Sequence, residues 1–356
     1  MDTPIVLSHK TAWLFHHAPL RHEVVREALN SSIDRYGLSE PHITAAQAAK
    51  RIVHFLSDCG VPVGMLEAGH ARNGDCSEHA PIIELLVATS NDRTSSKLFK
   101  TYSLGRPFNS SHLMHAAPGL FVVNEALNFM QAPTWMNPLE VLEYGFELCG
   151  RYELQILSPR QAYVECEPRC SLETIRHTLD AIPGMRGAHR ARRALARIRE
   201  GSRSPMETAL ALSILLPQKD GGLGYRNISL NHQIKIPAVL KPQCASDYLE
   251  ADVFAPKRRV DIEYDGGEHA ELARRTHDSD RTATFGALGI TQRTITAQHF
   301  AHQLEFHRSM NGIASLLRVD VPHSIEFQRK QNELRMFLIR NWNNNGNSNS
   351  GQHHGA

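Results

Sequence analysis

The stretch YLEADVFAPKRRVDIEYDGGEH, residues 248–269, decides how this chain folds. Its two runs predict two β-strands joined by a tight turn at residues 256–259. When the hairpin is folded about the bond between Lys257 and Arg258, Asp252 lies opposite Glu263, because both are equally far from that bond. Side chains directly opposite on one face of an antiparallel pair have Cβ atoms roughly 4.5–5.5 Å apart, and like charges there destabilise the sheet. The hairpin therefore needs a compensating cation, and a divalent metal ion is the candidate.

Alternation along each strand predicts a dense cluster of acids around this pair. Asp261 and Asp265 share a face with Glu263, and Glu250 shares a face with Asp252. Mg²⁺ suits such a site, because it is a hard ion that takes one or two carboxylates, several waters and phosphate oxygens. The alternative is a solvated acidic face that the basic residues of the turn neutralise. The hairpin taken alone leaves both interpretations open.

The bulk composition is that of an ordinary globular protein with a sizeable core. The 356 residues predict two domains, and 41% are hydrophobic, 21% are charged and the mean hydropathy is −0.35. The net charge of +2 gives no global field for a polyanionic partner, so any nucleic-acid affinity must come from local patches. The start of the chain lacks the basic and apolar regions of a secretory signal, and no apolar run is long enough to span a membrane. We therefore expect a cytoplasmic protein without a membrane partner.

The six cysteines do not form a recognisable framework. Only Cys166 and Cys170 are close in sequence, and they lack the second pair that a zinc knuckle needs. A chain of this size without a dense cysteine pattern favours free thiols over disulfides.

The order of patterns along the chain predicts an α/β protein with several segments. Helices are expected at residues 44–59, 138–144 and 171–181, strands at 81–89 and 120–123, and a loop at 159–170. Further on, we expect helices at 204–216, 271–288, 299–317 and 324–342, and strands at 228–236 and 290–296. The predicted organisation is a mixed α/β domain at 1–180, an arginine-rich connector helix at 181–203, a domain at 204–320, a C-terminal helix at 321–342 and a disordered polar tail at 343–356.

The connector stands out by its charge. Residues 185–203 contain seven arginines against one acid, Glu200. On a helix, Arg190, Arg193 and Arg197 would share one face and could meet a phosphate backbone. A solvated linker helix explains the same pattern, and both interpretations stay open.

Residues 204–207, Ser-Pro-Met-Glu, have the pattern of a helix start. A serine at the cap, a proline in the first turn and a glutamate three residues after the cap predict a complete capping box. Glu207 would then serve the helix, or it would point at the acidic hairpin and supply a further carboxylate.

Three further positions near the hairpin are candidates. His269 follows the paired glycines that end the second strand, where it could contact a phosphate or orient a water. Asp278 and Arg281 lie three residues apart on the next predicted helix, a spacing that a plain ion pair explains. Lys257 in the turn could fold towards the site or bind a DNA backbone, and a solvated turn lysine is the simpler interpretation.

The order helix with acid, strand, strand with Asp252, strand with Glu263, helix, strand resembles the PD-(D/E)XK nuclease superfamily, and more closely the endonuclease domains related to very-short-patch repair nucleases. The motifs that carry the resemblance are SPMET at 204–208, EADVF at 250–254, VDIEYDGGEH at 260–269, the D-x-x-R of 278–281 and GALGI at 286–290. They cover about residues 200–300. GFELCGRY at 145–152 resembles abortive-infection-type antitoxin proteins and implies no activity here.

The resemblance implies a restriction-endonuclease-like αβββαβ core. It also implies hydrolysis of DNA phosphodiesters with Mg²⁺ or Mn²⁺ held by Asp252 and Glu263, and with Glu207 as a further ligand or nearby acid. Asp265 stands where the family has a lysine, which puts the general base in doubt, and Asp265 or His269 would orient the water. DNA would be held by basic side chains of the connector, the turn and the following helix: Arg190, Arg193, Arg197, Lys257, Arg258, Arg259 and Arg281.

Other functions fit the same residues. The missing lysine also permits a nuclease fold that binds DNA or regulates without cleavage. A third interpretation is an interaction component of a defence or toxin–antitoxin system. RNA is a second candidate substrate, and a homodimer or a separate protein partner is compatible with the sequence.

Overall fold

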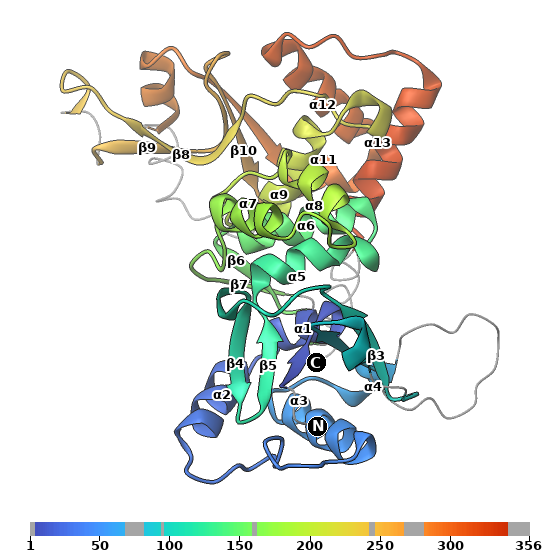
Figure 1. The fold of residues 1–356 in the computed structure, drawn as a ribbon. Coiled ribbons are helices and arrows are strands. Elements are labelled where there is room, and N and C mark those ends of the chain that lie inside the picture. Colours follow the sequence, from blue (N-terminus) through green and yellow to red (C-terminus); the bar gives the residue numbers. More distant parts are fainter. Residues whose placement is uncertain are drawn as a thin grey trace, which may run out of the picture. The chain divides into compact units, whose positions relative to one another are not determined.

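A computed structural model describes residues 4–67, 82–93, 96–158, 162–241, 246–266 and 281–340, and the chain divides into two compact units (Figure 1). Unit 1 comprises Met1–Leu148, Glu153–Val164 and Arg169–Ile198. Unit 2 comprises Cys149–Tyr152, Glu165–Pro168 and Arg199–Ala356. Within the described ranges, no helix is both long enough and apolar enough to span a bilayer. The predicted tail at 343–356 lies outside the described residues.

Unit 1 is built on a mixed five-stranded sheet in the order β3-β2-β1-β5-β4. Strand β1 runs antiparallel to β2 and parallel to β5. The strands are β1 (Ile5–Leu7), β2 (Ile83–Val87), β3 (Phe99–Ser103), β4 (Leu113–Ala117) and β5 (Leu120–Val123). The helices are α1 (His9–His16), α2 (Arg21–Asn30), α3 (Ala45–Asp58), α4 (Val63–Glu67), α5 (Glu125–Gln131), α6 (Pro138–Leu148), α7 (Leu172–Ala181) and α8 (Ala188–Leu195), with short 3₁₀ turns at η1 (Ser90–Asp92), η2 (Ser110–His112) and η3 (Ala132–Thr134).

The helix starts predicted in unit 1 are confirmed. Thr44 caps α3 in a complete capping box with Gln47, and Ile52, Phe55 and Leu56 on this helix are fully buried. Ser171 accepts a hydrogen bond from the backbone of Thr174 and so caps α7.

The predicted loop at 159–170 is wrong in part, because β7 (Tyr163–Glu165) pairs with β6 (Tyr152–Leu154). Tyr163 and Val164 are strand formers whose signal the neighbouring prolines and cysteines obscured. In the arginine-rich segment 181–203, only α8 is an α-helix, and the segment belongs to unit 1 as far as Ile198.

Unit 2 contains a mixed four-stranded sheet in the order β11-β10-β9-β8 among the described residues (Figure 1). Strand β9 runs antiparallel to both β8 and β10, and β11 runs parallel to β10. The elements are α9 (Pro205–Leu215), η4 (Gln218–Asp220), β8 (Ser229–Lys235), β9 (Tyr248–Ala255), β10 (Val260–Asp265), a helical segment at 281–287, β11 (Thr291–Thr296), α11 (Ala297–Ala301), α12 (Gln303–Leu317) and α13 (Ile325–Leu338). The predicted α/β class is confirmed.

Helix α9 contacts β9 and β10 and is the most buried helix of unit 2. Every residue from Thr208 to Leu215 is buried, so the helix is apolar on all sides. The first turn of α9 is only partly buried, and it brings Glu207 to the sheet, where Glu207 bonds to Asn231.

The predicted single helix at 299–317 is wrong, because the chain is extended at His302 between α11 and α12. Phe300 and Phe306 are both buried, with ring centroids 5.1 Å apart. Six residues along a continuous α-helix turn through roughly 600°, which would point the two rings to different sides. The break lets both rings enter the same core.

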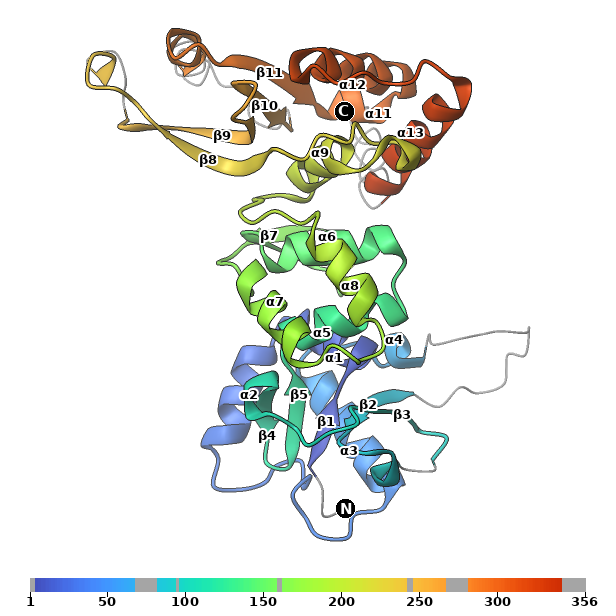
Figure 2. The same ribbon diagram turned by 45° about the horizontal axis from the view of Figure 1, so that its top comes forward.

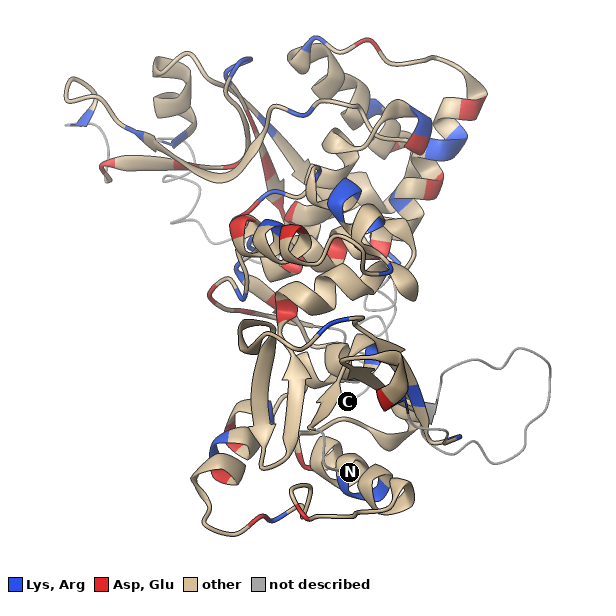
Figure 3. Cartoon of the chain, in the orientation of Figure 1, with Lys and Arg blue, Asp and Glu red and all other residues tan. Residues whose placement is uncertain are grey.

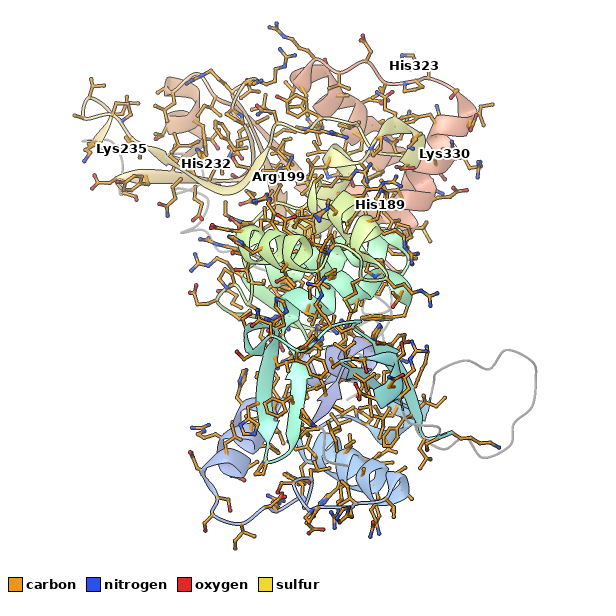
Figure 4. All side chains as sticks on the ribbon, viewed as in Figure 1. His189, Arg199, His232, Lys235, His323 and Lys330 are labelled. Carbon is orange, nitrogen blue, oxygen red and sulfur yellow. The ribbon has the colours of Figure 1, made fainter. Side chains whose placement is uncertain are left out.

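Strands β8 and β9 continue as a two-stranded ribbon beyond the end of β10 (Figure 2). In the ribbon Gln233 pairs with Glu250 and Lys235 with Tyr248. His232 and Lys235 on β8 are labelled in Figure 4. The apolar side chains of the ribbon pack in a cluster with the helical segment: Ile234, Ile236, Leu249, Phe285 and Ile290.

Candidate active site

Strands β9 and β10 part at the predicted acidic pair. Val260 pairs with Ala255 and Ile262 with Val253, which is the register predicted from the turn. Continued by one residue, this register sets Glu263 opposite Asp252, but the backbone pairing ends before that point. Beyond it β9 pairs with β8, and β10 pairs with β11. The acids therefore lie at a fork between two strands, which we call the strand fork.

Asp252 closes the strand fork with its side chain. Its Oδ2 accepts a hydrogen bond of 3.0 Å from the backbone N–H of Tyr264, which lies past the end of the pairing between β9 and β10. Burial, followed by the charges of Glu263 and Glu207, raises the pKa of Asp252 to about 7, although the Tyr264 N–H and Arg281 act in the opposite direction. The negative charge around the Asp252 carboxyl group is therefore only partly balanced by the Tyr264 N–H and Arg281.

Glu263 is held by a guanidinium group. Arg281 Nη2 lies 2.6 Å from Oε1 and Nη1 lies 2.9 Å from Oε2, which is a bidentate pair. The second Nη2 hydrogen bond of Arg281 goes to the backbone carbonyl of Glu250. Arg281 was also predicted to bind nucleic acid, and the structure places its guanidinium on Glu263. Its predicted pairing with Asp278 falls on a residue outside the described ranges.

Glu207 reaches the sheet from the first turn of α9. Ser204 caps the helix by accepting a hydrogen bond from the Glu207 N–H, as predicted. The other half of the predicted capping box is wrong, because Glu207 Oε2 accepts from the backbone of Arg203 at 2.8 Å and not from the cap residue. Oε2 also accepts from Asn231 at 2.7 Å. Burial raises the pKa of Glu207 above its usual value despite these hydrogen bonds.

Asp261 is a member of the site that was not selected from the sequence. Its side chain is completely buried, its Oδ1 has no hydrogen-bond partner among the described residues, and its Oδ2 lies 3.3 Å from the amide of Gln292. Burial, followed by the hydrogen bond and the charge of Glu263, raises the pKa of Asp261 to about 10. The alternation of acids on β10 was the available signal, but it did not show that this member points inward.

Asn231 is the second missed residue. It lies on β8 between Leu230 and His232, which pair with Val253 and Ala251, so it stands beside Asp252. Its backbone has a left-handed φ of 43°, a conformation that asparagine tolerates better than most residues and that is often found at functional sites. Its amide joins Glu207 to the carbonyl of Gly201 at 2.8 Å. An asparagine inside a strand is a weak signal, and nothing in the sequence linked it to Glu207.

Asp265, His269 and Asp278 are the remaining candidates from the sequence. Asp265 is exposed at the end of β10 and is in register with Thr296. His269 and Asp278 lie outside the described residues. Figure 3 shows acidic residues along β9 and β10.

The basic turn is at the opposite end of the hairpin from the strand fork. Asp252 lies four positions before the start of the turn, which is roughly 13 Å along a strand. Arg258 donates to the carbonyl of Leu317 at 2.8 Å, and Arg259 donates to the carbonyls of Leu288 and Gly289. Both arginines therefore donate to carbonyls at or just beyond the C-terminal ends of helices, whereas Lys257 is an exposed turn residue.

The predicted arginine face lies in unit 1. Helix α8 buries Ala188, Ala191 and Ala194 and exposes Arg190 and Arg193. Arg197 follows the end of the helix and is partly exposed.

The donor set suits a hard divalent cation only in part. Within the described ranges, no three His, Cys, Asp or Glu side chains are arranged to hold a metal ion. Mg²⁺ needs only one or two carboxylates, however, and the strand fork offers carboxylate oxygens together with the buried Oδ1 of Asp261, which has no hydrogen-bond partner. Excess negative charge is the feature that a cation would relieve.

Among the described residues, the thiols form no competing metal site. Cys59 and Cys149 are buried, and Cys166 and Cys170 are partly buried free thiols, as predicted. Cys76 and Cys244 lie outside the described residues.

No family model, no curated protein and no solved structure matches this chain. The site therefore has to be interpreted from its own geometry.

Proposed function

We propose that unit 2 is a metal-dependent endonuclease domain of the restriction-endonuclease-like type, which hydrolyses phosphodiester bonds in DNA. The observation that carries this proposal is the strand fork, where buried carboxyl groups face one another with too little positive charge. Titratable groups with raised pKa values at such a place are typical of functional sites. The order of α9, β8, β9, β10, the helical segment and β11 supports the same proposal.

Asp252 and Glu263 would hold the cation, with Glu207 as a further ligand or as an acid that orients a bound water. A bound Mg²⁺ or Mn²⁺ supplies charge for the phosphate and lowers the pKa of a water. Each carboxylate has about four lone-pair positions, so Glu263 can keep its bond to Arg281 and still serve a cation. Asn231 and the Arg203 N–H hold Glu207 in place through Oε2.

In the proposed reaction, water forms a bond to phosphorus while the bond from phosphorus to the leaving sugar oxygen breaks. The water gives up a proton and the leaving oxygen gains one. Asp265, exposed at the end of β10, or His269 would orient the water. Arg190, Arg193 and Arg197 in unit 1 and Lys257, Arg258 and Arg259 in unit 2 would hold the DNA backbone without reading its sequence. RNA is the second substrate to test.

Cleavage of supercoiled plasmid by the full chain tests the proposal. We expect nicked or linear product with Mg²⁺ or Mn²⁺ and none with EDTA. The variant Asp252→Asn should lose about 10³-fold or more of the rate, because it removes the central carboxylate. Glu305→Gln is the matched control, because Glu305 is an exposed acid on α12 that pairs with Arg308. Equal inactivity of wild type and Asp252→Asn with both metals and both nucleic acids would refute the nuclease proposal.

A DNA-binding protein without cleavage is the second candidate, and one observation favours it. Both oxygens of Glu263 bond to Arg281, and no lysine follows Glu263 on β10. This candidate predicts salt-sensitive binding of a duplex with no cleavage in either metal. Product formation that Glu263→Gln abolishes would exclude it.

A further inference from the structure

The strand fork contains a positively charged side chain, that of Arg281, which lies on a neighbouring helix and not on β10. Arg281 is the first described residue of the helical segment 281–287, and its charge acts on Asp252, Asp261 and Glu263. After Glu263, β10 ends with Asp265, which adds negative charge where a cation would help to bind a phosphate. The positively charged partner of Glu263 therefore lies 18 residues further along the chain.

The guanidinium group of Arg281 is held in place but remains accessible to a further ligand. Three of its N–H groups are used within the described residues, two on Glu263 and one on the Glu250 carbonyl. An arginine has five such donors. The two that remain are Nε–H and one N–H of Nη1, which lie on different edges of the guanidinium plane, so a further acceptor can receive one of them. The Arg281 side chain is 32% exposed, against 13% for Glu263, so it faces the outside of the fork while Glu263 lies behind it.

The surroundings of Arg281 restrict its movement. Its guanidinium carbon lies 5.3 Å from the centroid of the Phe285 ring, one turn along the same helix, and that ring is completely buried. A planar guanidinium that is fixed by a ring and a carboxylate can offer its remaining donors in a constant direction. This preorganisation is what recognition of a phosphate requires.

We infer that Arg281 binds the scissile phosphate and takes the place of the lysine that β10 lacks. The inference rests on the proposed function of unit 2. Glu263 orients the guanidinium from behind, and one remaining N–H donates to a non-bridging phosphate oxygen, on which negative charge increases as the water attacks. Arg281 is thus a phosphate-binding residue of the reaction and not only a partner that neutralises Glu263.

The test compares Arg281→Gln and Arg281→Lys with the full wild-type chain. Arg308→Gln is the matched control, because Arg308 is an exposed arginine on α12 that also pairs with a glutamate. Single-turnover cleavage at saturating DNA should fall by about 10²–10³-fold in Arg281→Gln, the usual loss for a donor to a developing negative charge. Arg281→Lys keeps the charge but loses the fork geometry and should fall by about 10-fold. Thermal unfolding confirms that each variant is folded.

Magnesium titration separates phosphate binding from mere neutralisation. If Arg281 only balances the acids, added Mg²⁺ will replace its charge and restore the rate of Arg281→Gln. If Arg281 binds phosphate, the loss will persist at saturating Mg²⁺. Restoration by Mg²⁺, or a rate for Arg281→Gln within threefold of wild type, overturns the inference and leaves the nuclease proposal intact.

A binding measurement decides the inference even if the wild type does not cleave. Anisotropy of a labelled 30-base-pair duplex is followed in Ca²⁺ over a range of NaCl concentrations. Loss of one phosphate contact should reduce the slope of log K against log salt by about 0.9 in Arg281→Gln but not in Arg308→Gln. Equal slopes would overturn the inference, whereas inactivity of the wild type would overturn the nuclease proposal only.

Discussion

Each unit buries a glutamate or aspartate, and the two units treat that charge in opposite ways. In unit 1, Glu147 is 2% exposed, and its Oε1 lies 2.7 Å from Arg169 Nη2, 3.0 Å from His17 Nε2 and 3.0 Å from the Leu154 N–H. Burial alone would raise the pKa of Glu147, but the charges of His17 and Arg169 outweigh it and hold the pKa below its usual value. This carboxylate is fully neutralised.

In unit 2, the balance is reversed. Asp252 and Asp261 are surrounded by other carboxyl groups, and their pKa values rise to about 7 and about 10. Arg281 is shared among them and does not cancel the excess. A buried ion pair that is complete has a structural role, whereas an incomplete one that the fold retains suggests a ligand. The difference is one of charge balance, since both sites lie largely out of water.

The largest effect on stability should come from breaking the complete cluster. Glu147→Gln removes the negative charge and leaves the buried Arg169 with only its longer contact, 3.8 Å, to Glu153. We expect the free energy of unfolding to fall by about 3–5 kcal/mol. Asp252→Asn removes repulsion and should leave the stability unchanged or raise it at pH 7.5. Denaturant unfolding of both variants measures the contrast, and an equal loss in both would contradict it.

The pH dependence should sharpen the contrast. A carboxyl group whose pKa is higher in the folded state binds its proton more tightly there, so its contribution to stability falls as pH rises from about 4 through about 7 for Asp252. Between pH 5 and pH 8, wild type should therefore lose of the order of 2 kcal/mol relative to Asp252→Asn. Denaturant unfolding without divalent ions measures this difference.

Added Mg²⁺ provides the control for the pH experiment. A cation bound at the strand fork favours ionised carboxylates, so it should stabilise wild type more at pH 8 than at pH 5. It should have little effect on Asp252→Asn. A wild-type chain whose stability relative to this variant does not change with pH would show that the fork acids are neutralised in solution.

The smallest effect should come from the helix caps, which both units make locally. Thr44 caps α3 in unit 1, and Ser204 caps α9 in unit 2. Thr44→Ala and Ser204→Ala should each lower the free energy of unfolding by about 1 kcal/mol. A much larger loss for Ser204→Ala would show that the cap also holds Glu207 in its place beside Asn231. Exchange of Ser204 for Thr is the matched control, since it keeps the hydroxyl.

Counting residues along the chain was enough to predict the hairpin, its register and the side chains that share a face. A strand alternates with a period of two, and the turn sets which residues lie opposite each other, so the approach of Asp252 to Glu263 followed from counting. The caps at Thr44, Ser171 and Ser204 were equally local, because each needs only residues within one helical turn.

Which groups surround the acidic side chains depends on the packing of distant elements. The structure showed where the pairing of β9 with β10 ends. It also joined Arg281 to Glu263, 18 positions apart in the sequence, and Asn231 to Glu207, 24 positions apart. The burial of Asp261 depends on packing that no local period encodes. Charge balance in a low-dielectric site is a sum over all neighbours, and those neighbours are known only when distant elements have come together.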